Sequence, residues 1–485
     1  MNQATEAKTI LMTTEPVEKL ILRLSVPTII SMMVTAFYNL ADTFFIRQLN
    51  SDSMVAAVGI CLPLMNIIQA IGFYHGNGSG NYISRAYGRR DFQDAEKMAA
   101  TGFFFALAFG ILLMATGLCF RSGFARVLGA KTPETLVNSI RYMRWILLAA
   151  PLMMGSIVFN NQLRMQGNAI FSMFGLASGA ILNLILDPML IFRAGDSIGI
   201  AGIRAAFGAG LGVSGAALAT AISQCVSFTV LAVGLFRSDS INIRLKNFSP
   251  TIHYIRGIMQ AGLPSLARQG IASIATASLN NSIGLFLAGS LMIDAAQAAM
   301  TGVNRIMMLL ASVLIGFGQG FQPVCGFNYG AGKYGRVKQA FRFCVKLAAM
   351  VLICLAVLGF VFARPVTNLV AGASREAAEI AVFAFRAQLV TLPLHAWIVL
   401  CNMMLQNIGA TAKATMLAIS RQGLAFIPMV LLLPLLLQSL GLAPLLGIEI
   451  AQPAADIISF VIAIPIALSE LRKMREPQDQ DRLPV

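Results

Sequence analysis

The stretch LSVPTIISMMVTAFYNLADTFFI, residues 24–46, decides the fold class. It is long enough for a helix to cross the hydrocarbon core of a bilayer, which takes about 20 residues, and Asp42 is its only charged residue. The whole chain has the same character, with 57% hydrophobic and 12% charged residues, whereas soluble domains carry about 25% charged residues. Outer-membrane strands would instead alternate in segments of about 10 residues. The sequence therefore predicts an all-α, polytopic membrane protein.

The same kind of apolar block recurs along the chain, and each block has the length of one membrane crossing. We expect twelve transmembrane helices, near residues 20–46, 54–80, 98–120, 138–160, 169–192, 211–236, 257–285, 290–322, 343–363, 378–403, 414–438 and 444–470. The polar start of the chain lacks the features of a cleavable signal peptide, so the first span is expected to be retained.

The formal net charge of +15 is explained by the distribution of lysine and arginine over the connecting segments. If the N-terminus is cytoplasmic, the inner segments hold 21 basic residues and the outer segments 9. Because cytoplasmic loops are enriched in Lys and Arg, we expect both termini in the cytoplasm and the protein in the inner membrane. Topology and contact with anionic lipid account for the charge, so no nucleic-acid partner is expected.

An internal repeat relates the two halves at a shift of 242 residues. At this shift Gly76 falls on Gly318, and Asn160 falls on Asn402. Transporters are commonly built from such duplicated helix sets. We therefore expect two pseudo-symmetric six-helix lobes, 1–236 and 254–485, joined by a cytoplasmic linker at 237–253 and followed by a short cytoplasmic tail. Two such lobes form a path by themselves, so we expect a monomer.

Asp42 and a second carboxylate, Asp187, are predicted to lie at similar depths near the outer ends of spans one and five. Asn183 precedes Asp187 by one helical turn on the same face, and Pro188 removes a backbone donor beside the acid. Thr220 on span six enters at about the same depth. Carboxylate, amide and hydroxyl oxygens are suitable ligands for a small hard cation. Two close carboxylates in an apolar site cannot both stay ionised at low cost, so they would instead share a proton or bind such a cation. The alternative is that each aspartate snorkels to the interface.

A second candidate lies on span twelve, where EIAQPAAD places Glu449 and Asp456 on one helical face. Asp456 is predicted to cap a backbone made irregular by Pro453, with an ion or substrate role as the alternative. His395, in LPLHAW, is a further candidate for the cleft lining. Arg144 and Arg386, at equivalent positions of the repeat, are expected to pair with acids or carbonyls near helix ends rather than to contact substrate, and no role is assigned to Arg268, Arg305, Arg421 and Lys346. The second half lacks the aspartate pair: near the start of each half the shift is 237 residues, which places Leu279 at the position of Asp42, and the shift of 242 places Met429 at that of Asp187.

The order of these motifs resembles the multidrug and toxic compound extrusion (MATE) family. The likeness rests on LSVPTIISMMVTAFYNLADTFF, NNQLRMQGNA (160–169), LNLILDP (182–188) and CNMMLQNIGATAKA (401–414), and it runs over nearly the whole chain. It implies an inner-membrane antiporter that exports amphipathic, often cationic compounds against an inward H⁺ or Na⁺ gradient. It also implies an ion site at Asp42, Asn183, Asp187 and Thr220.

Other functions are kept as alternatives or set aside on the same residues. A flippase for a lipid-linked oligosaccharide or another lipid precursor shares the plan of this superfamily and remains the alternative. A membrane enzyme would need its histidines gathered with an acid or a serine, whereas His75, His253 and His395 are far apart in the sequence. We therefore expect no enzymatic activity and no cofactor. The cysteine spacing indicates no structural metal site, so the only metal considered is Na⁺ at Asp42 and Asp187.

Overall fold

A computed structural model describes residues 3–49, 51–196, 208–237, 241, 243–287, 292–368 and 374–474. Side chains are not described at eight helical positions, 3, 4, 39, 40, 42, 43, 47 and 52. Within these ranges the chain is helical and has no β-strand, as the long apolar blocks predict. The predicted all-α fold class is confirmed.

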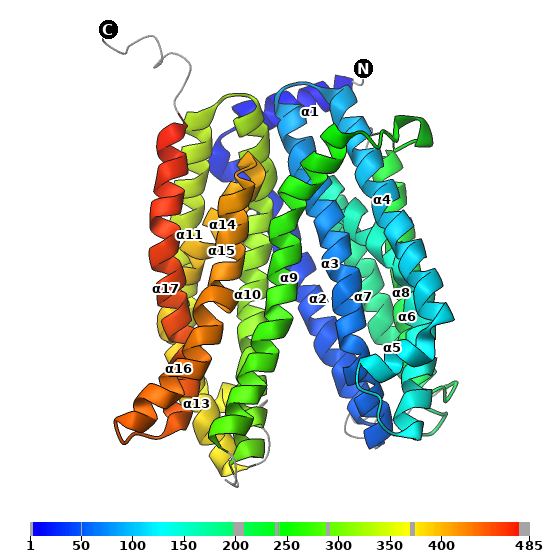
Figure 1. Ribbon diagram of the computed structural model, residues 1–485. Helices are drawn as coiled ribbons and strands as arrows, with labels where there is room; N and C mark the ends of the chain where they lie inside the picture. The colour runs from blue at the N-terminus through cyan, green and yellow to red at the C-terminus, as the bar shows by residue number, and fades with distance from the viewer. Residues whose placement is uncertain are drawn as a thin grey trace. The chain divides into compact units, whose positions relative to one another are not determined.

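The chain divides into two compact units, which are described separately. The N-terminal unit comprises Met1–Met12 and Val26–Gly262. Its helices are α1 (Gln3–Thr14), most of α2 (Val17–Arg47), α3 (Asp52–Gly88), α4 (Phe92–Cys119), α5 (Arg121–Val127), α6 (Pro133–Met165), α7 (Ala169–Ile191), α8 (Val213–Arg237) and the short 3₁₀ turn η1 (Leu245–Asn247) (Figure 1).

The C-terminal unit comprises Thr13–Ser25 and Leu263–Val485. Its helices are most of α9 (Ile252–Phe286), then α10 (Ile293–Gly330), α11 (Tyr334–Val361), α12 (Ala363–Asn368), α13 (Arg375–Thr391), α14 (Leu394–Ile408), α15 (Thr411–Ile419), the π-helix η2 (Ser420–Ala425), α16 (Phe426–Ser439) and α17 (Pro444–Lys473) (Figure 1).

Each predicted span coincides with one helix or with consecutive helices. Ten helices of the described residues are long and apolar enough to cross a membrane, and the bent pair α13 and α14 makes an eleventh crossing. The twelfth expected span is α9, which has 35 residues but lacks a stretch as apolar as those of the ten helices. The arrangement agrees with the twelve transmembrane helices expected from the sequence.

The boundary between the units lies inside α2 and α9. The start of α2 packs on α10, since Ser25 Oγ donates to the Phe317 carbonyl at 3.1 Å. The start of α9 packs equally closely on α3, because a Cβ at Gly262 would lie 2.2 Å from the Tyr74 carbonyl oxygen. Close helix packing at glycine and serine is usual in membrane proteins. The linker that the sequence predicts between the lobes, 237–253, comes just before the part of α9 where the two units divide.

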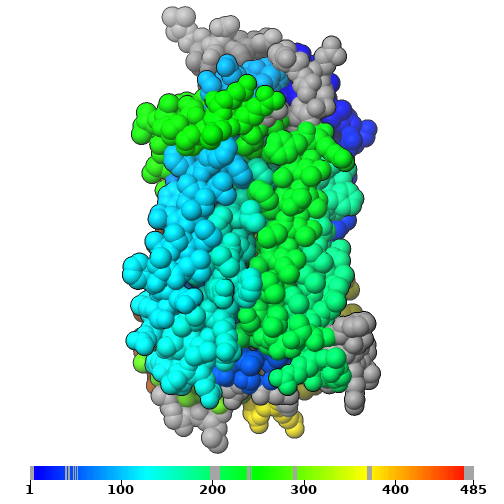
Figure 2. Space-filling view, turned by 90° about the vertical axis from the view of Figure 1, so that its right-hand side faces the viewer, coloured from blue at the N-terminus to red at the C-terminus, as the bar shows by residue number. Residues whose placement is uncertain are grey.

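That segment, as far as it is described, packs on the N-terminal unit. The Phe248 ring lies 5.7 Å from the rings of Phe104 and Phe105 on α4, and Asn247 donates to Glu96 at 3.1 Å. Figure 2 shows the segment lying across one end of this face of the unit. Residues 238–240 and 242 of the predicted linker lie outside the described residues.

The internal repeat appears as the same hydrogen bond in both halves. Asn160 Nδ2 donates to the Ser172 carbonyl at 3.1 Å, and Asn402 Nδ2 donates to the Ala414 carbonyl at 2.7 Å. Donor and acceptor are both shifted by 242 residues. The repeat predicted from the sequence is therefore present in the structure.

Helix ends are repeated as well. Thr132 caps α6 with its side chain, and Ser374, its equivalent, caps α13. Gly167 and Gly409 have φ values of 77° and 83° just past the ends of equivalent helices. Glycine reaches this left-handed conformation without the penalty that a Cβ imposes, which explains why both copies carry it.

The halves differ at one equivalent proline. Pro151 lies inside the continuous helix α6, whereas Pro393 separates α13 from α14, whose axes are bent by 58°. Proline lacks the backbone donor that a regular helix needs, so it permits such a break without requiring it. The break in the C-terminal unit creates the candidate site described below.

Candidate functional sites

Small residues bring α7 and α8 of the N-terminal unit into close contact. A Cβ at Gly215 would lie 2.3 Å from the Leu190 carbonyl oxygen, and a Cβ at Gly179 would lie 2.9 Å from Ser227 Cβ. Ser227 Oγ also donates to the Gly175 carbonyl at 2.8 Å. The two backbones approach this closely only because these positions are glycine.

We expect Gly215→Ala to destabilise the protein by about 1–3 kcal/mol, the usual cost of forcing extra volume into a packed contact. The added carbon meets backbone rather than a flexible side chain, so the helices must move. Thermal unfolding in detergent measures the effect. Gly59→Ala is the matched control, because a Cβ there meets nothing within 4 Å; an equal loss of stability in both variants would contradict the close contact.

Asn183 and Asp187 lie one turn apart on α7, as the sequence predicts. Asn183 Nδ2 donates to Asp187 Oδ1 at 3.2 Å. Asp187 is 0% exposed and Asn183 is 2% exposed, so neither side chain reaches solvent. The Oδ1 atom of Asn183 is buried without a hydrogen-bond donor among the described residues. A buried polar atom without a partner is costly, which favours a functional role for this pair.

Thr220 lies on α8 at the level of this pair. Along the antiparallel α7 and α8, Gly215 contacts Leu190 and Ser227 contacts Gly179, which places Thr220 between these levels, opposite the 183–187 turn. Thr220 is 4% exposed. The sequence reasoning missed Ser223, one turn further on α8, whose buried hydroxyl has no partner among the described residues. Its helical spacing from Thr220 could have suggested it.

Asp42 belongs to α2, but its side chain lies outside the described residues. The described neighbour Phe45, three residues later, packs edge to face on Phe192 with ring centroids 6.4 Å apart. Phe192 follows Asp187 by five residues. This contact brings the end of α2 beside the end of α7.

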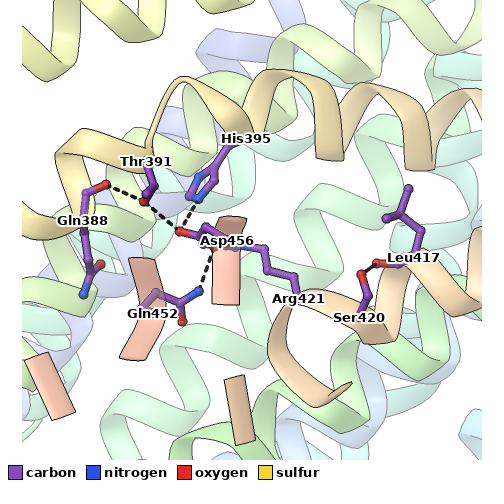
Figure 3. Close-up of polar contacts among 8 residues, drawn as sticks. All are labelled: Gln388, Thr391, His395, Leu417, Ser420, Arg421, Gln452 and Asp456. Carbon is purple, nitrogen blue, oxygen red and sulfur yellow. Dashed lines mark hydrogen bonds and ion pairs between the residues drawn. The ribbon is translucent and has the colours of Figure 1, made fainter. Parts of the chain in front are cut away.

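In the C-terminal unit, Asp456 is the centre of a buried cluster of side chains (Figure 3). Its Oδ1 accepts from Arg421 Nε at 2.7 Å and from Gln452 Nε2 at 2.9 Å. Its Oδ2 accepts from His395 Nε2 at 2.9 Å and from Thr391 Oγ1 at 3.2 Å. The Asp456 side chain is 1% exposed. Four donors occupy both oxygens of this carboxylate.

Irregular backbone positions three of these donors. Thr391 ends α13 and His395 lies in the first turn of α14, so both belong to the break at Pro393. Arg421 belongs to the π-helix η2, whose first residue, Ser420, donates its hydroxyl to the Leu417 carbonyl at 2.9 Å (Figure 3). A π-helical turn shifts the following side chains around the helix and often marks a functional position.

The prediction that Asp456 caps irregular backbone is wrong. Every hydrogen bond that its carboxylate accepts within the described residues comes from a side chain, and α17 continues through Pro453. Arg421, which had no assigned role, is its ionic partner. The i, i+7 pattern on α17 identified the acid but gave no information on partners from other helices.

Glu449 differs from Asp456 in its surroundings. It is 6% exposed, and no hydrogen bond or ion pair of its carboxyl group is found in the described part of the chain. Burial of an ionised carboxylate without partners is costly, which favours binding of a proton or a cation. Glu449 is therefore the better candidate of the two for binding an ion in this unit.

A duplicated set of membrane-spanning helices with buried carboxylates inside its spans defines a polytopic membrane transporter. Comparison with known protein families shows which family of membrane transporters the chain belongs to. The MatE family model matches residues 27–189 and 271–432, one match in each half, and the chain belongs to the MatE family.

Curated relatives and solved structures agree with this assignment. The chain is 27% identical over 422 residues to the multidrug export protein MepA of Staphylococcus aureus strain MSSA476, covering 86% of this chain and 87% of that protein. It is also 27% identical over 446 residues to MepA of Staphylococcus saprophyticus, covering 91% of each. The structure resembles an outward-facing multidrug resistance MATE family transporter of the MOP superfamily with a TM-score of 0.85 and 27% identity, covering 96% of this chain and 98% of that one.

Proposed function

We propose that this protein is a secondary antiporter that exports amphipathic, often cationic compounds in exchange for inward H⁺ or Na⁺. The observation that carries the proposal is the fully buried Asp187 beside Asn183 inside an apolar span. An acid at such a position in a transporter is a functional group by default. Its relatives named multidrug export proteins support the substrate class.

The coupling ion is proposed to bind at Asp187 with Asn183 and Thr220, together with Asp42. Carboxylate, amide and hydroxyl oxygens are ligands for hard cations, and a carboxylate also accepts a proton. The two lobes then alternate between outward-open and inward-open states, and ion binding lowers the affinity for the exported compound. The coupling is only as large as the difference in ion affinity between the two states.

The N-terminal unit is the better position for this coupling. At the equivalent positions of the second half the repeat has Leu279 and Met429, which bind neither protons nor cations. Asp456 already accepts four hydrogen bonds. Glu449, followed by Asp456 and His395, remains the secondary candidate for an ion or a substrate.

The proposed location is the inner membrane, with both termini in the cytoplasm. The support is the excess of lysine and arginine in the segments assigned to the inner side. In this orientation an inward gradient of protons or of sodium across that membrane drives export.

Everted membrane vesicles test the proposal directly. Vesicles that contain the protein are loaded with either acidic or sodium-rich buffer and diluted into a medium that contains a fluorescent cationic dye. We expect dye to accumulate inside in response to one of the two gradients and to be released when that gradient is collapsed by an ionophore. Flipping of a labelled lipid-linked oligosaccharide without dye transport would favour the flippase alternative and overturn the antiporter.

A further inference from the structure

Three basic residues follow one another along a single face of α11 in the C-terminal unit. Lys338, Arg342 and Lys346 are spaced by four residues, which places them one above another on the helix. Arg342 and Lys346 are exposed and Lys338 is half-buried. Among the candidate spans of the described chain, α11 is the most apolar and the least buried. A row of cations along such a helix needs an explanation.

None of the three cations has a partner within the described part of the chain. The neighbouring Arg336 shows the contrast. Its Nε donates to Asn328 Oδ1 at 2.8 Å, and its Nη2 donates to the Glu15 carbonyl at 2.6 Å. Near the start of α11, Arg336 is therefore held by hydrogen bonds within the protein, whereas the other three cations are available to an external partner.

These cations border a groove of about 450 Å³, to which Phe343 contributes an apolar wall. One acid, Glu18, lies at the rim and accepts a hydrogen bond from Gln339 Nε2 at 2.8 Å. With three cations and one carboxylate, the groove keeps a net positive charge. A partner that fits it carries negative charge and is small enough for a headgroup-sized site.

The same face of α11 becomes apolar immediately beyond Lys346. Met350, Ile353 and Val357 continue the stripe and are 48%, 49% and 59% exposed. A face that is cationic for two turns and apolar for the next three matches a molecule with an anionic head and hydrocarbon chains. A free phosphate would use only the first part of the stripe.

The direction in which helical side chains point agrees with cationic residues near the start of α11 and apolar residues after them. Side chains on a helix lean toward its N-terminus, which for α11 is the end that follows the turn at residues 331–333. Arg342 and Lys346 therefore extend toward the membrane surface, where long basic side chains place their charges. Lys346 follows the first residue of α11 by twelve residues, and its long side chain extends its charge toward that end of the helix.

We propose that this face of α11 binds one anionic phospholipid. Its phosphate contacts Lys338, Arg342 and Lys346 in the groove, and its acyl chains lie along Met350, Ile353 and Val357. Basic pockets at the ends of transmembrane helices are known to hold anionic headgroups. The site does not depend on which compound the protein transports.

Native mass spectrometry of the purified, delipidated full chain tests the site. The protein is titrated with phosphatidylglycerol, with phosphatidylcholine, and with glycerol phosphate, which has the headgroup charge but no chains. We expect the wild type to bind phosphatidylglycerol in preference to the other two. Arg342→Gln with Lys346→Gln is expected to weaken phosphatidylglycerol binding roughly 25-fold, at about fivefold for each cation removed.

The matched control removes two exposed cations elsewhere, Arg244→Gln with Arg472→Gln, and is expected to bind phosphatidylglycerol as the wild type does. The charge-conserving pair Arg342→Lys with Lys346→Arg should also retain binding, and thermal unfolding without lipid shows whether each variant is folded. Equal weakening in the control would reduce the effect to overall charge and overturn the site. Binding of glycerol phosphate as tight as that of the lipid would make the groove an anion site and overturn the lipid proposal.

Discussion

Asp187→Asn is expected to reduce gradient-driven export strongly while the protein remains folded. Asparagine has the same shape and still forms a hydrogen bond with Asn183, but it holds neither an exchangeable proton nor a negative charge for Na⁺. We expect the dye accumulated in vesicles to fall by roughly 5- to 150-fold, the range of typical coupling free energies. Asp42→Asn should have a similar effect if the two acids share the ion.

Two measurements separate loss of coupling from loss of folding. Dye binding to the purified Asp187→Asn variant, measured without any gradient, should be retained. Asp196→Asn is the matched control, because Asp196 is an exposed acid just after α7 that accepts from the Arg193 backbone N–H at 2.8 Å. Full gradient-driven transport by Asp187→Asn would remove the proposed ion site from α7.

The fold could be predicted from the sequence because lipid imposes one strong requirement. Backbone groups in hydrocarbon must be satisfied within the segment, so an apolar block of sufficient length has to be a helix. All twelve predicted blocks are helical for this reason, and even α9, with its less apolar composition, was identified. The repeat was equally visible, because it depends on matching residues such as Asn160 and Asn402.

The candidate sites were predictable only within one helix. The pair Asn183 and Asp187 follows from helical spacing, and the structure shows their hydrogen bond. Three of the four partners of Asp456, namely Thr391, His395 and Arg421, come from other segments, and Arg421 precedes it by 35 residues, whereas Gln452 lies one turn away on the same helix. Helical periodicity contains no information about contacts of that kind. At the shift of 242, Arg421 corresponds to Gly179, so the repeat gave no hint either.

The helix break at Pro393 also could not be predicted from the sequence, because it depends on contacts with other helices. Its equivalent Pro151 lies in a continuous helix, where Gly110 of α4 comes so close that a Cβ would lie 2.6 Å from Pro151 Cα. The repeat has Leu352 in place of Gly110. The two prolines therefore have different neighbours, and a pattern that considers only the proline predicts the same outcome for both.

The ion pair of Arg421 and Asp456 should have the largest effect on stability of any interaction considered above. Arg421→Gln is expected to cost about 3–5 kcal/mol, because it leaves a buried carboxylate without its ionic partner. Asp456→Asn should cost less, since the Arg421 side chain is 27% exposed and water can partly solvate it, whereas Asp456 is 1% exposed. Thermal unfolding in detergent ranks the two variants.

The double variant, Arg421→Gln with Asp456→Asn, identifies what the cluster does. If Asp456 mainly holds the broken span α13–α14 and η2 together, removing both charges should cost less than the sum of the single changes, because no unpaired charge remains buried. His395→Leu, which removes the donor to Oδ2, should cost only about 1–3 kcal/mol. An Asp456→Asn variant as stable as the wild type but unable to transport would contradict the structural role. The coupling ion would then have to be sought in the C-terminal unit, where Glu449 lies two turns away on the same face of α17.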